Sequence, residues 1–131
     1  TRIIRLDNSY DTILANMHEK GRYNIRLGEK RGVIVSNNPF AEENIDSFYD
    51  LLADTAKRDG FAINSRSTFE SLVSLQSDTI EVRLFEAMHP LYTRSIASAL
   101  YIACGDTAYY YYGASVGDSE TKKLMASFVI Q

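Results

Sequence analysis

Three segments rich in β-branched, aromatic and alanine residues follow one another in the second half of the chain, and no other feature constrains the fold as strongly. They are Ile80 to Ala87, Ser95 to Ala103 and Thr107 to Ala114. The first alternates between apolar and polar residues, which predicts a strand with one buried face. The second is apolar at most positions and is predicted to lie centrally in a sheet. Cys104-Gly105-Asp106-Thr107 joins the last two as a tight turn, so they are predicted to form an antiparallel hairpin.

Helical patterns surround these strands. Asn44 to Lys57 carries apolar residues at helical spacing, with Phe48, Leu51 and Leu52 on one face, and Gly60 is suited to end the helix. This helix is predicted to pack across the hairpin through that face. The remaining predicted elements are, in chain order, a short strand over 1–6, helices from 10 and over 22–31, a strand over 33–35, a turn over 37–39, a helix over 67–75 and a last helix that Ser119 caps and that runs to Gln131. Helices, then antiparallel strands, then a helix predict an α+β domain.

Length and charge narrow the class of protein. The chain of 131 residues has the size of one domain, and its net charge of -3 excludes a basic field over the whole surface. The single cysteine, Cys104, excludes an internal disulfide and is predicted to be a buried apolar residue. No apolar run approaches the roughly 20 residues of a membrane span. Neither His18 nor His89 stands in a metal-ligand pattern, so no metal site is expected.

Basic residues cluster between Lys20 and Arg31. Arg22, Arg26 and Lys30 recur every four residues and would line one face of a helix, which we call the basic stripe. Guanidinium groups bind phosphate oxygens in pairs, so the basic stripe could contact phosphate. A solvated helix face is the alternative interpretation.

Two arginines and a tyrosine run are further candidates for a site. Arg58 closes the long helix, where the helix dipole also favours a cation. Arg66 is predicted in a loop, from which it could reach a ligand. The run Tyr109 to Tyr112 would place two hydroxyl groups on each face of a strand. A tyrosine hydroxyl can donate to a developing oxyanion or orient an amine, and β propensity with packing is the alternative explanation.

Four stretches of the chain resemble sequence motifs of a known protein family. They are Lys20-Gly21-Arg22-Tyr23-Asn24-Ile25-Arg26 with Gly32-Val33, the helix end Thr55 to Phe61, the hairpin Ile96 to Leu100 with Ala108 to Ser115, and Lys123 to Gln131. In this order, over nearly the whole chain, they resemble the Fem peptidoglycan-bridge aminoacyltransferases. The sequence departs from that family at Thr68 and Phe69, where many relatives carry a tyrosine pair, and at Asn64, where a basic residue is common.

The resemblance implies a GCN5-related N-acetyltransferase-like domain with a mixed, largely antiparallel sheet and packed helices. It would be the second of two such domains and incomplete at its C-terminus. Residues 1–31 would be a strand and helical entry segment from the preceding domain, and residues 32–131 the acyltransferase-like domain.

Fem proteins move an amino acid from aminoacyl-tRNA to the stem-peptide amine of a peptidoglycan precursor, without a metal or bound cofactor. The resemblance therefore implies three partners: aminoacyl-tRNA, a lipid-linked or nucleotide-linked precursor, and the rest of the parent chain. We also expect self-association, for example as a homodimer, and a location in the cytoplasm or at the inner membrane surface.

The resemblance also suggests roles for the candidate residues. Tyr110 and Tyr112 would share the cleft-facing side of their strand as catalytic residues, or Tyr109 and Tyr111 would do so if the register flips. Arg66 and Arg58 would bind the precursor. The basic stripe would meet tRNA or the precursor diphosphate.

Two other functions remain open from the sequence. An acyl-CoA-dependent N-acyltransferase of the same fold needs a pyrophosphate loop before the last helix, and Ser115 to Ser119 offers only one glycine and an acidic residue there. The other is a fragment that binds its ligands without turning them over.

Overall fold

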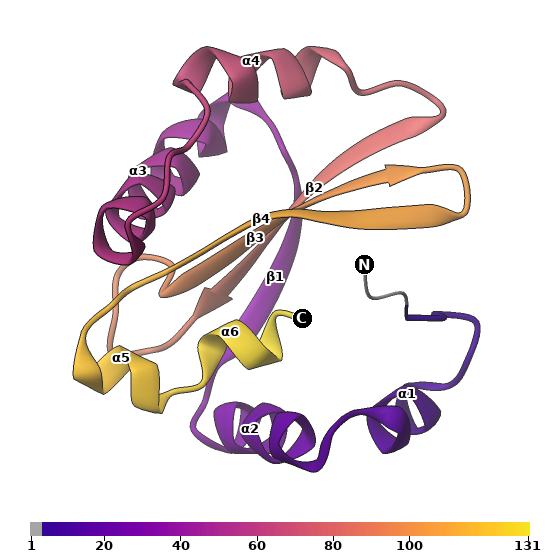
Figure 1. The fold of residues 1–131 in the computed structure, drawn as a ribbon, viewed down its shortest axis with the longest axis vertical. Helices are drawn as coiled ribbons and strands as arrows, with labels where there is room; N and C mark the ends of the chain where they lie inside the picture. Colours follow the sequence, from indigo (N-terminus) through magenta and orange to yellow (C-terminus); the bar gives the residue numbers. More distant parts are fainter. Residues whose placement is uncertain (1–3) are drawn as a thin grey trace.

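A computed structural model describes residues 4–131 (Figure 1). Its elements are, in chain order, α1 (Tyr10–Asn16), α2 (Glu19–Lys30), β1 (Ile34–Pro39), α3 (Glu42–Asp59), α4 (Arg66–Ser74), β2 (Ile80–Met88), β3 (Ala97–Cys104), β4 (Thr107–Ser115), α5 (Ser119–Lys123) and α6 (Ala126–Val129). The predicted strand over 1–6 lies partly outside the described residues, and residues 4–6 are not in a strand.

The four strands form one antiparallel sheet in the order β1-β2-β3-β4 (Figure 1). The hairpin of β3 and β4 is confirmed, with Gly105 in its turn at a φ of 60°. β3 lies between two neighbours, as its apolar sequence predicts. β4 has one neighbour among the described residues, so the hairpin does not lie wholly in the centre of the sheet. Cys104 is exposed rather than buried, because it ends β3 beside the turn.

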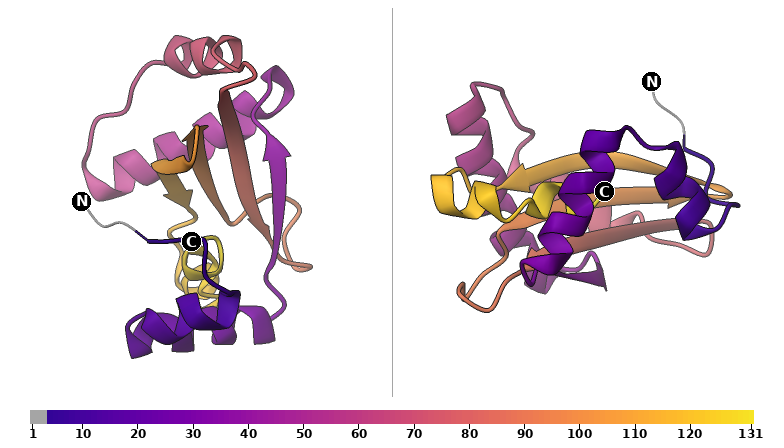
Figure 2. Two further views of the ribbon diagram at one scale, coloured as in Figure 1. Left: turned by 90° about the vertical axis from the view of Figure 1, so that its right-hand side faces the viewer. Right: turned by 90° about the horizontal axis from the view of Figure 1, so that it is seen from below.

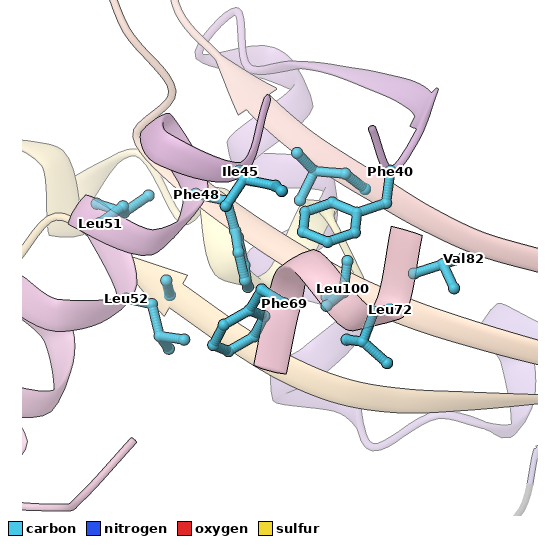
Figure 3. Packing of buried hydrophobic residues seen from close by; sticks show 11 residues of the cluster. Phe40, Ile45, Phe48, Leu51, Leu52, Phe69, Leu72, Val82 and Leu100 are labelled. Atoms are coloured by element: carbon cyan, nitrogen blue, oxygen red, sulfur yellow. The ribbon is translucent and has the colours of Figure 1, made fainter. Parts of the chain in front are cut away.

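Helices α3 and α4 cover one face of the sheet (Figures 1 and 2). Phe48 and Leu52 of α3 are fully buried, and Phe69 of α4 packs edge-on against Phe48 with ring centroids 5.6 Å apart (Figure 3). Val82 and Leu100 complete this cluster from the sheet. Burying one such side chain contributes about 1.5–3 kcal/mol, so this layer holds α3 across the hairpin as predicted.

The opposite face of the sheet is covered by α6, with α2 packed outside it (Figure 2). Ala126 is buried against small residues of the sheet. Gly28 of α2 lies so close to α6 that an added Cβ would clash with the side chain of Val129. Arg31, which follows α2, donates from Nη1 to the carbonyl of Lys123 at the end of α5. The segment of α2 and Arg31 is therefore packed against α6 and hydrogen-bonded to the end of α5.

The prediction for residues 37–39 is wrong. The turn predicted over 37–39 is instead part of β1, where Pro39 pairs with Arg83. Proline is tolerated there because β1 lies at one edge of the described sheet, so the missing N–H can face away from the ladder.

The last helical region also differs from its prediction. Asp118, not Ser119, caps it, with Oδ1 accepting two backbone N–H groups at 2.9 and 3.0 Å. The region consists of two short helices rather than one, because Met125 adopts a left-handed conformation with a φ of 58°.

Candidate functional site

Two cavities meet where the C-terminal end of α3 faces the end of β4. The larger cavity, about 430 Å³, has three cationic residues in its lining: Lys57, Arg58 and Arg94. The smaller cavity, about 160 Å³, lies between the ends of α3, β4 and α6, and we call it the Ser98 cavity after one of its lining residues. Arg58 and Ser115 line both cavities and separate them.

Ser115, the last residue of β4, is bonded to α3 through two side chains. Its N–H donates to Thr55 Oγ1 at 3.0 Å, and its carbonyl oxygen lies 3.1 Å from the same hydroxyl. Arg58 donates from Nη1 to this carbonyl at 2.6 Å. The Nε and Nη2 atoms of Arg58 donate to the two carboxylate oxygens of Asp59, at 2.7 and 2.8 Å respectively. Arg58 therefore joins α3 to β4, and its charge is already paired.

A β-bulge shapes β4 beside the Ser98 cavity. Leu100 pairs with Tyr112, but the next residue of β3, Tyr101, pairs with Tyr110, so Tyr111 is the extra residue. Paired residues lie on the same face of a sheet, and Leu100 and Tyr101 face opposite sides. Tyr110 and Tyr112 therefore also face opposite sides. The prediction that they share one face is wrong.

The two tyrosines have different surroundings. Tyr112 packs against Phe69 in the core under α4, with ring centroids 5.4 Å apart. Tyr110 packs edge-on against Tyr101 at 5.3 Å and lines the Ser98 cavity. Its hydroxyl lies over Gly113, where any side chain would clash with it. Tyr110 is half-buried, and this partial burial raises its pKa further above the ordinary tyrosine value of about 10. Its phenol is therefore protonated at neutral pH and can donate a hydrogen bond.

Ser98 lines the same cavity, and sequence reasoning missed it. Ser98 is 2% exposed, and among the described residues its Oγ is the one buried side-chain oxygen or nitrogen without a hydrogen-bond partner. The register places it between Glu86 of β2 and Ala114 of β4. Glu86 is half-buried and accepts a hydrogen bond from Ser95 Oγ at 2.6 Å. The only sequence signal was a serine within an apolar strand, which does not reveal what it faces.

Comparison with known proteins identifies the family. The model of the FemAB family matches residues 3–95, which is most of the chain. The chain belongs to the FemAB family. A Lipid II:glycine glycyltransferase of Staphylococcus aureus is 29% identical to it over 85 residues, as are those of the strains COL and N315. These alignments cover 65% of this chain and 20% of each relative, so the chain spans about a fifth of the length of these curated relatives.

A solved structure supports the fold of this FemAB chain. This chain matches the crystal structure of FemX with a TM-score of 0.77, at 18% sequence identity. The match covers 94% of this chain and 46% of the FemX chain. The predicted GCN5-related acetyltransferase-like fold is confirmed by this likeness. The family match ends at residue 95, so Ser98, Tyr110 and Tyr112 lie beyond it.

Arg66 of this FemAB chain is not in a loop, as predicted, but is the first residue of α4. Its Nε donates to Asp46 Oδ1 at 2.8 Å, and it also forms an ion pair with Glu70. Arg66 does not line either of the two cavities. A precursor phosphate or carboxylate would have to compete with these two carboxylates for it.

The basic stripe lies on α2, and its three residues have different surroundings. Arg22 donates from Nη1 to the carbonyls of Ala15 and Met17, at 3.1 and 2.5 Å, and so satisfies the C-terminal end of α1. Arg26 and Lys30 are exposed and form no ion pair within residues 4–131. Two of the three cations are therefore free to meet a polyanion.

Over the part of the chain that the structure describes, no group of three or more His, Cys, Asp and Glu side chains could hold a metal ion. None of the helices described is long and apolar enough to span a bilayer.

Proposed function

We propose that this chain is part of an aminoacyltransferase that moves an amino acid from aminoacyl-tRNA to the stem-peptide amine of a peptidoglycan precursor. In this proposal residues 32–131 form the acyltransferase-like domain, and residues 1–31 enter it from a preceding domain. The partners are aminoacyl-tRNA, a lipid-linked or nucleotide-linked precursor and the rest of a longer chain. The reaction takes place in the cytoplasm or at the inner membrane surface, with aminoacyl-tRNA as co-substrate and no metal or bound cofactor.

Membership of the FemAB family carries the proposal. The relatives from Staphylococcus aureus are named for glycyl transfer involving lipid II, which is an acyl transfer of the proposed kind. The two cavities at the junction of α3 and β4 support the proposal, because they offer space for a ligand beside polar side chains.

Tyr110 is the residue that best suits the chemistry. When an amine attacks an ester, the carbonyl oxygen gains negative charge, and a fixed hydrogen-bond donor stabilises that charge. Tyr110 lines a cavity, and its phenol is protonated at neutral pH, as any tyrosine is, with partial burial raising its pKa further. Arg58 and Thr55 act as positioning residues, since they hold the end of β4 against α3. Tyr112 contributes packing instead, because it lies in the core.

An acyl-CoA donor is the second candidate, and Asp118 argues against it. A pyrophosphate would bind the free N–H groups at the start of a helix that follows β4. In this chain the Asp118 carboxylate already accepts the N–H groups of Glu120 and Thr121 at the start of α5. Its negative charge would also repel a pyrophosphate at this position.

A transfer assay with two donors tests the proposal. The chain is incubated with a lipid-linked or a nucleotide-linked precursor and either labelled glycyl-tRNA or labelled acetyl-CoA. We expect label in the precursor from glycyl-tRNA alone. Label from acetyl-CoA would favour the second candidate. Tight binding of tRNA and precursor with no label from either donor would favour a fragment that binds without turnover.

A further inference from the structure

We propose that the exposed side of α2 is a docking surface for a membrane that carries anionic lipids. We call this surface the α2 patch, and its members are four exposed side chains: Lys20, Tyr23, Arg26 and Lys30. The inference rests on the proposed function for one point only, which is that a lipid-linked precursor gives the chain a reason to be at a membrane. It names the face of the molecule that meets the lipid and the chemistry that holds it there.

Charge is divided between the two sides of the sheet. The segment of α2 and Arg31 holds five basic and two acidic residues, whereas α3 holds six acidic and two basic residues. These two helices belong to layers on opposite faces of the sheet (Figure 2). An anionic surface attracts the layer of α2 and repels the layer of α3, so it orients the molecule with α2 toward the surface.

The cations of the α2 patch point away from the protein. The buried residues of α2 are Asn24, Ile25 and Gly28, so the opposite side of the helix is open. None of the three cationic side chains of the α2 patch forms an ion pair within residues 4–131. Their charges are therefore available to the phosphates of lipid headgroups.

Exposed tyrosines accompany these cations. Tyr23 is 63% exposed, and Tyr10 of α1 is 60% exposed and donates to Glu29 Oε1 at 3.4 Å. Tyrosine is enriched where a membrane meets water, because its ring is apolar and its hydroxyl stays hydrated. The bond from Tyr10 also occupies one of the two carboxylates of α2. The other carboxylate, Glu19, lies in the first turn, where the helix dipole favours an acidic residue.

An anionic lipid surface explains these features better than a nucleic acid does. The basic stripe would be a regular row of phosphate contacts only if all three of its residues faced outward. Arg22 instead donates to the carbonyls of Ala15 and Met17. A membrane needs no such row, because its charge extends over the whole α2 layer and acts on every cation within about one Debye length, roughly 8 Å at physiological salt.

Sedimentation of the chain with lipid vesicles tests the inference. We expect binding at low salt to vesicles of equimolar phosphatidylglycerol and phosphatidylcholine, weak binding to phosphatidylcholine alone, and release as salt is raised. Arg26→Gln combined with Lys30→Gln should weaken binding about 30-fold, since each basic residue near an anionic surface contributes about fivefold. Tyr23→Ala should cause a smaller loss.

A matched control separates the α2 patch from net charge. Lys57→Gln combined with Arg83→Gln removes the same amount of charge from α3 and β2, and it should weaken vesicle binding much less. Thermal unfolding checks that both double variants are folded. Arg22 is left unchanged, because it holds the end of α1.

Three results would overturn the inference. The first is no binding of the parent chain to the anionic vesicles at low salt. The second is an equal loss in both double variants, which would assign the binding to net charge. The third is binding of tRNA, but not of vesicles, through Arg26 and Lys30, which would assign the surface to nucleic acid. Because no transfer is measured, a chain that binds vesicles but transfers no amino acid would refute the proposed function and leave this inference standing.

Discussion

At the residue scale, the placement of the site depends on Thr55. This threonine is buried in α3, and its Oγ1 accepts a hydrogen bond from the Ser115 N–H. Its single proton can go to the carbonyl of Leu51 at 2.8 Å or to that of Ser115 at 3.1 Å. The arrangement brings Arg58, one turn further along α3, to the same carbonyl. The boundary between the two cavities is therefore built from one helix turn and one strand end.

Replacing Thr55 by valine should destabilise the fold. Thr55→Val keeps the shape but leaves the Ser115 N–H without its acceptor, which costs about 1–3 kcal/mol. Thr55→Ser keeps the hydroxyl and loses one methyl group, a loss of about 0.8 kcal/mol. Urea denaturation of both variants measures the difference, and a valine variant more stable than the serine variant would contradict this role.

Replacing each tyrosine by phenylalanine should separate their roles. Tyr110→Phe removes the proposed oxyanion donor and should lower the transfer rate by about 10²-fold to 10³-fold. Tyr112→Phe should leave the rate near that of the parent, because the ring packs against Phe69.

The pH dependence of transfer should also report on Tyr110. Since burial raises its pKa, the donor proton is kept through neutral pH and is lost only above the ordinary tyrosine value of about 10. A Tyr110-dependent loss of rate between pH 7 and 9, absent in Tyr110→Phe, would contradict the assignment.

At the element scale, two glycines of α2 have opposite surroundings. Gly28 faces α6, where an added Cβ would clash with Val129, whereas only the end of Met17 lies within 4 Å of a Cβ added at Gly21. Helix propensity alone would favour alanine at both positions. Substitutions at these two glycines therefore test whether α2 packs against α6.

Alanine at the two glycines should have effects of opposite sign. Gly21→Ala should stabilise the chain by up to about 1 kcal/mol through helix propensity. Gly28→Ala should destabilise it by about 1–3 kcal/mol, because the added methyl overpacks the contact with Val129. Thermal unfolding of the two variants is the measurement, and equal stabilisation by both would mean that α2 is not docked as described.

Substitutions in the basic stripe should affect either tRNA binding or stability, depending on the residue. If Arg26 and Lys30 contact phosphate, replacing both by glutamine should weaken tRNA binding and reduce the salt slope by about one per phosphate lost. Arg22→Gln should instead lower stability, because Arg22 holds the end of α1.

Binding measured across a salt series distinguishes the two effects. Unchanged affinity at low salt in the double variant would show that Arg26 and Lys30 form a solvated face only. A fall in salt slope in Arg22→Gln alone would place the phosphate contact at the other end of α2.

At the scale of the whole molecule, the edge strand β4 carries a row of exposed aromatic rings. Tyr109, Tyr110 and Tyr111 are all substantially exposed, and β4 pairs on one side only among the described residues. An exposed, apolar edge strand is a template for pairing with another chain. Self-association through β4 is therefore expected.

A lysine on this edge should suppress association. Tyr109→Lys places a charge on β4, and sedimentation should show less dimer than for the parent at equal concentration. Leu91→Lys adds the same charge at an exposed residue between β2 and β3 and should not change association. A parent chain that stays monomeric over a wide concentration range would contradict the prediction.

Much of the fold could be predicted from the sequence because its signals are local. The apolar spacing that places Phe48, Leu51 and Leu52 on one face of α3, the glycine that ends this helix and the turn at Gly105 each depend on a few neighbouring residues. Periodicity and capping therefore determined the order of elements, the α+β class and the β3–β4 hairpin.

The site was decided by tertiary structure. The bulge at Tyr111 arises only when β4 pairs with β3, and it reverses the face of Tyr110 relative to Tyr112. The partners that engage Arg22 and Arg66, and the missing partner of Ser98, likewise depend on segments remote from them in sequence or on the register between strands. A side chain's type limits what it can bind, but its free hydrogen bonds and charge are known only after the fold has satisfied the others.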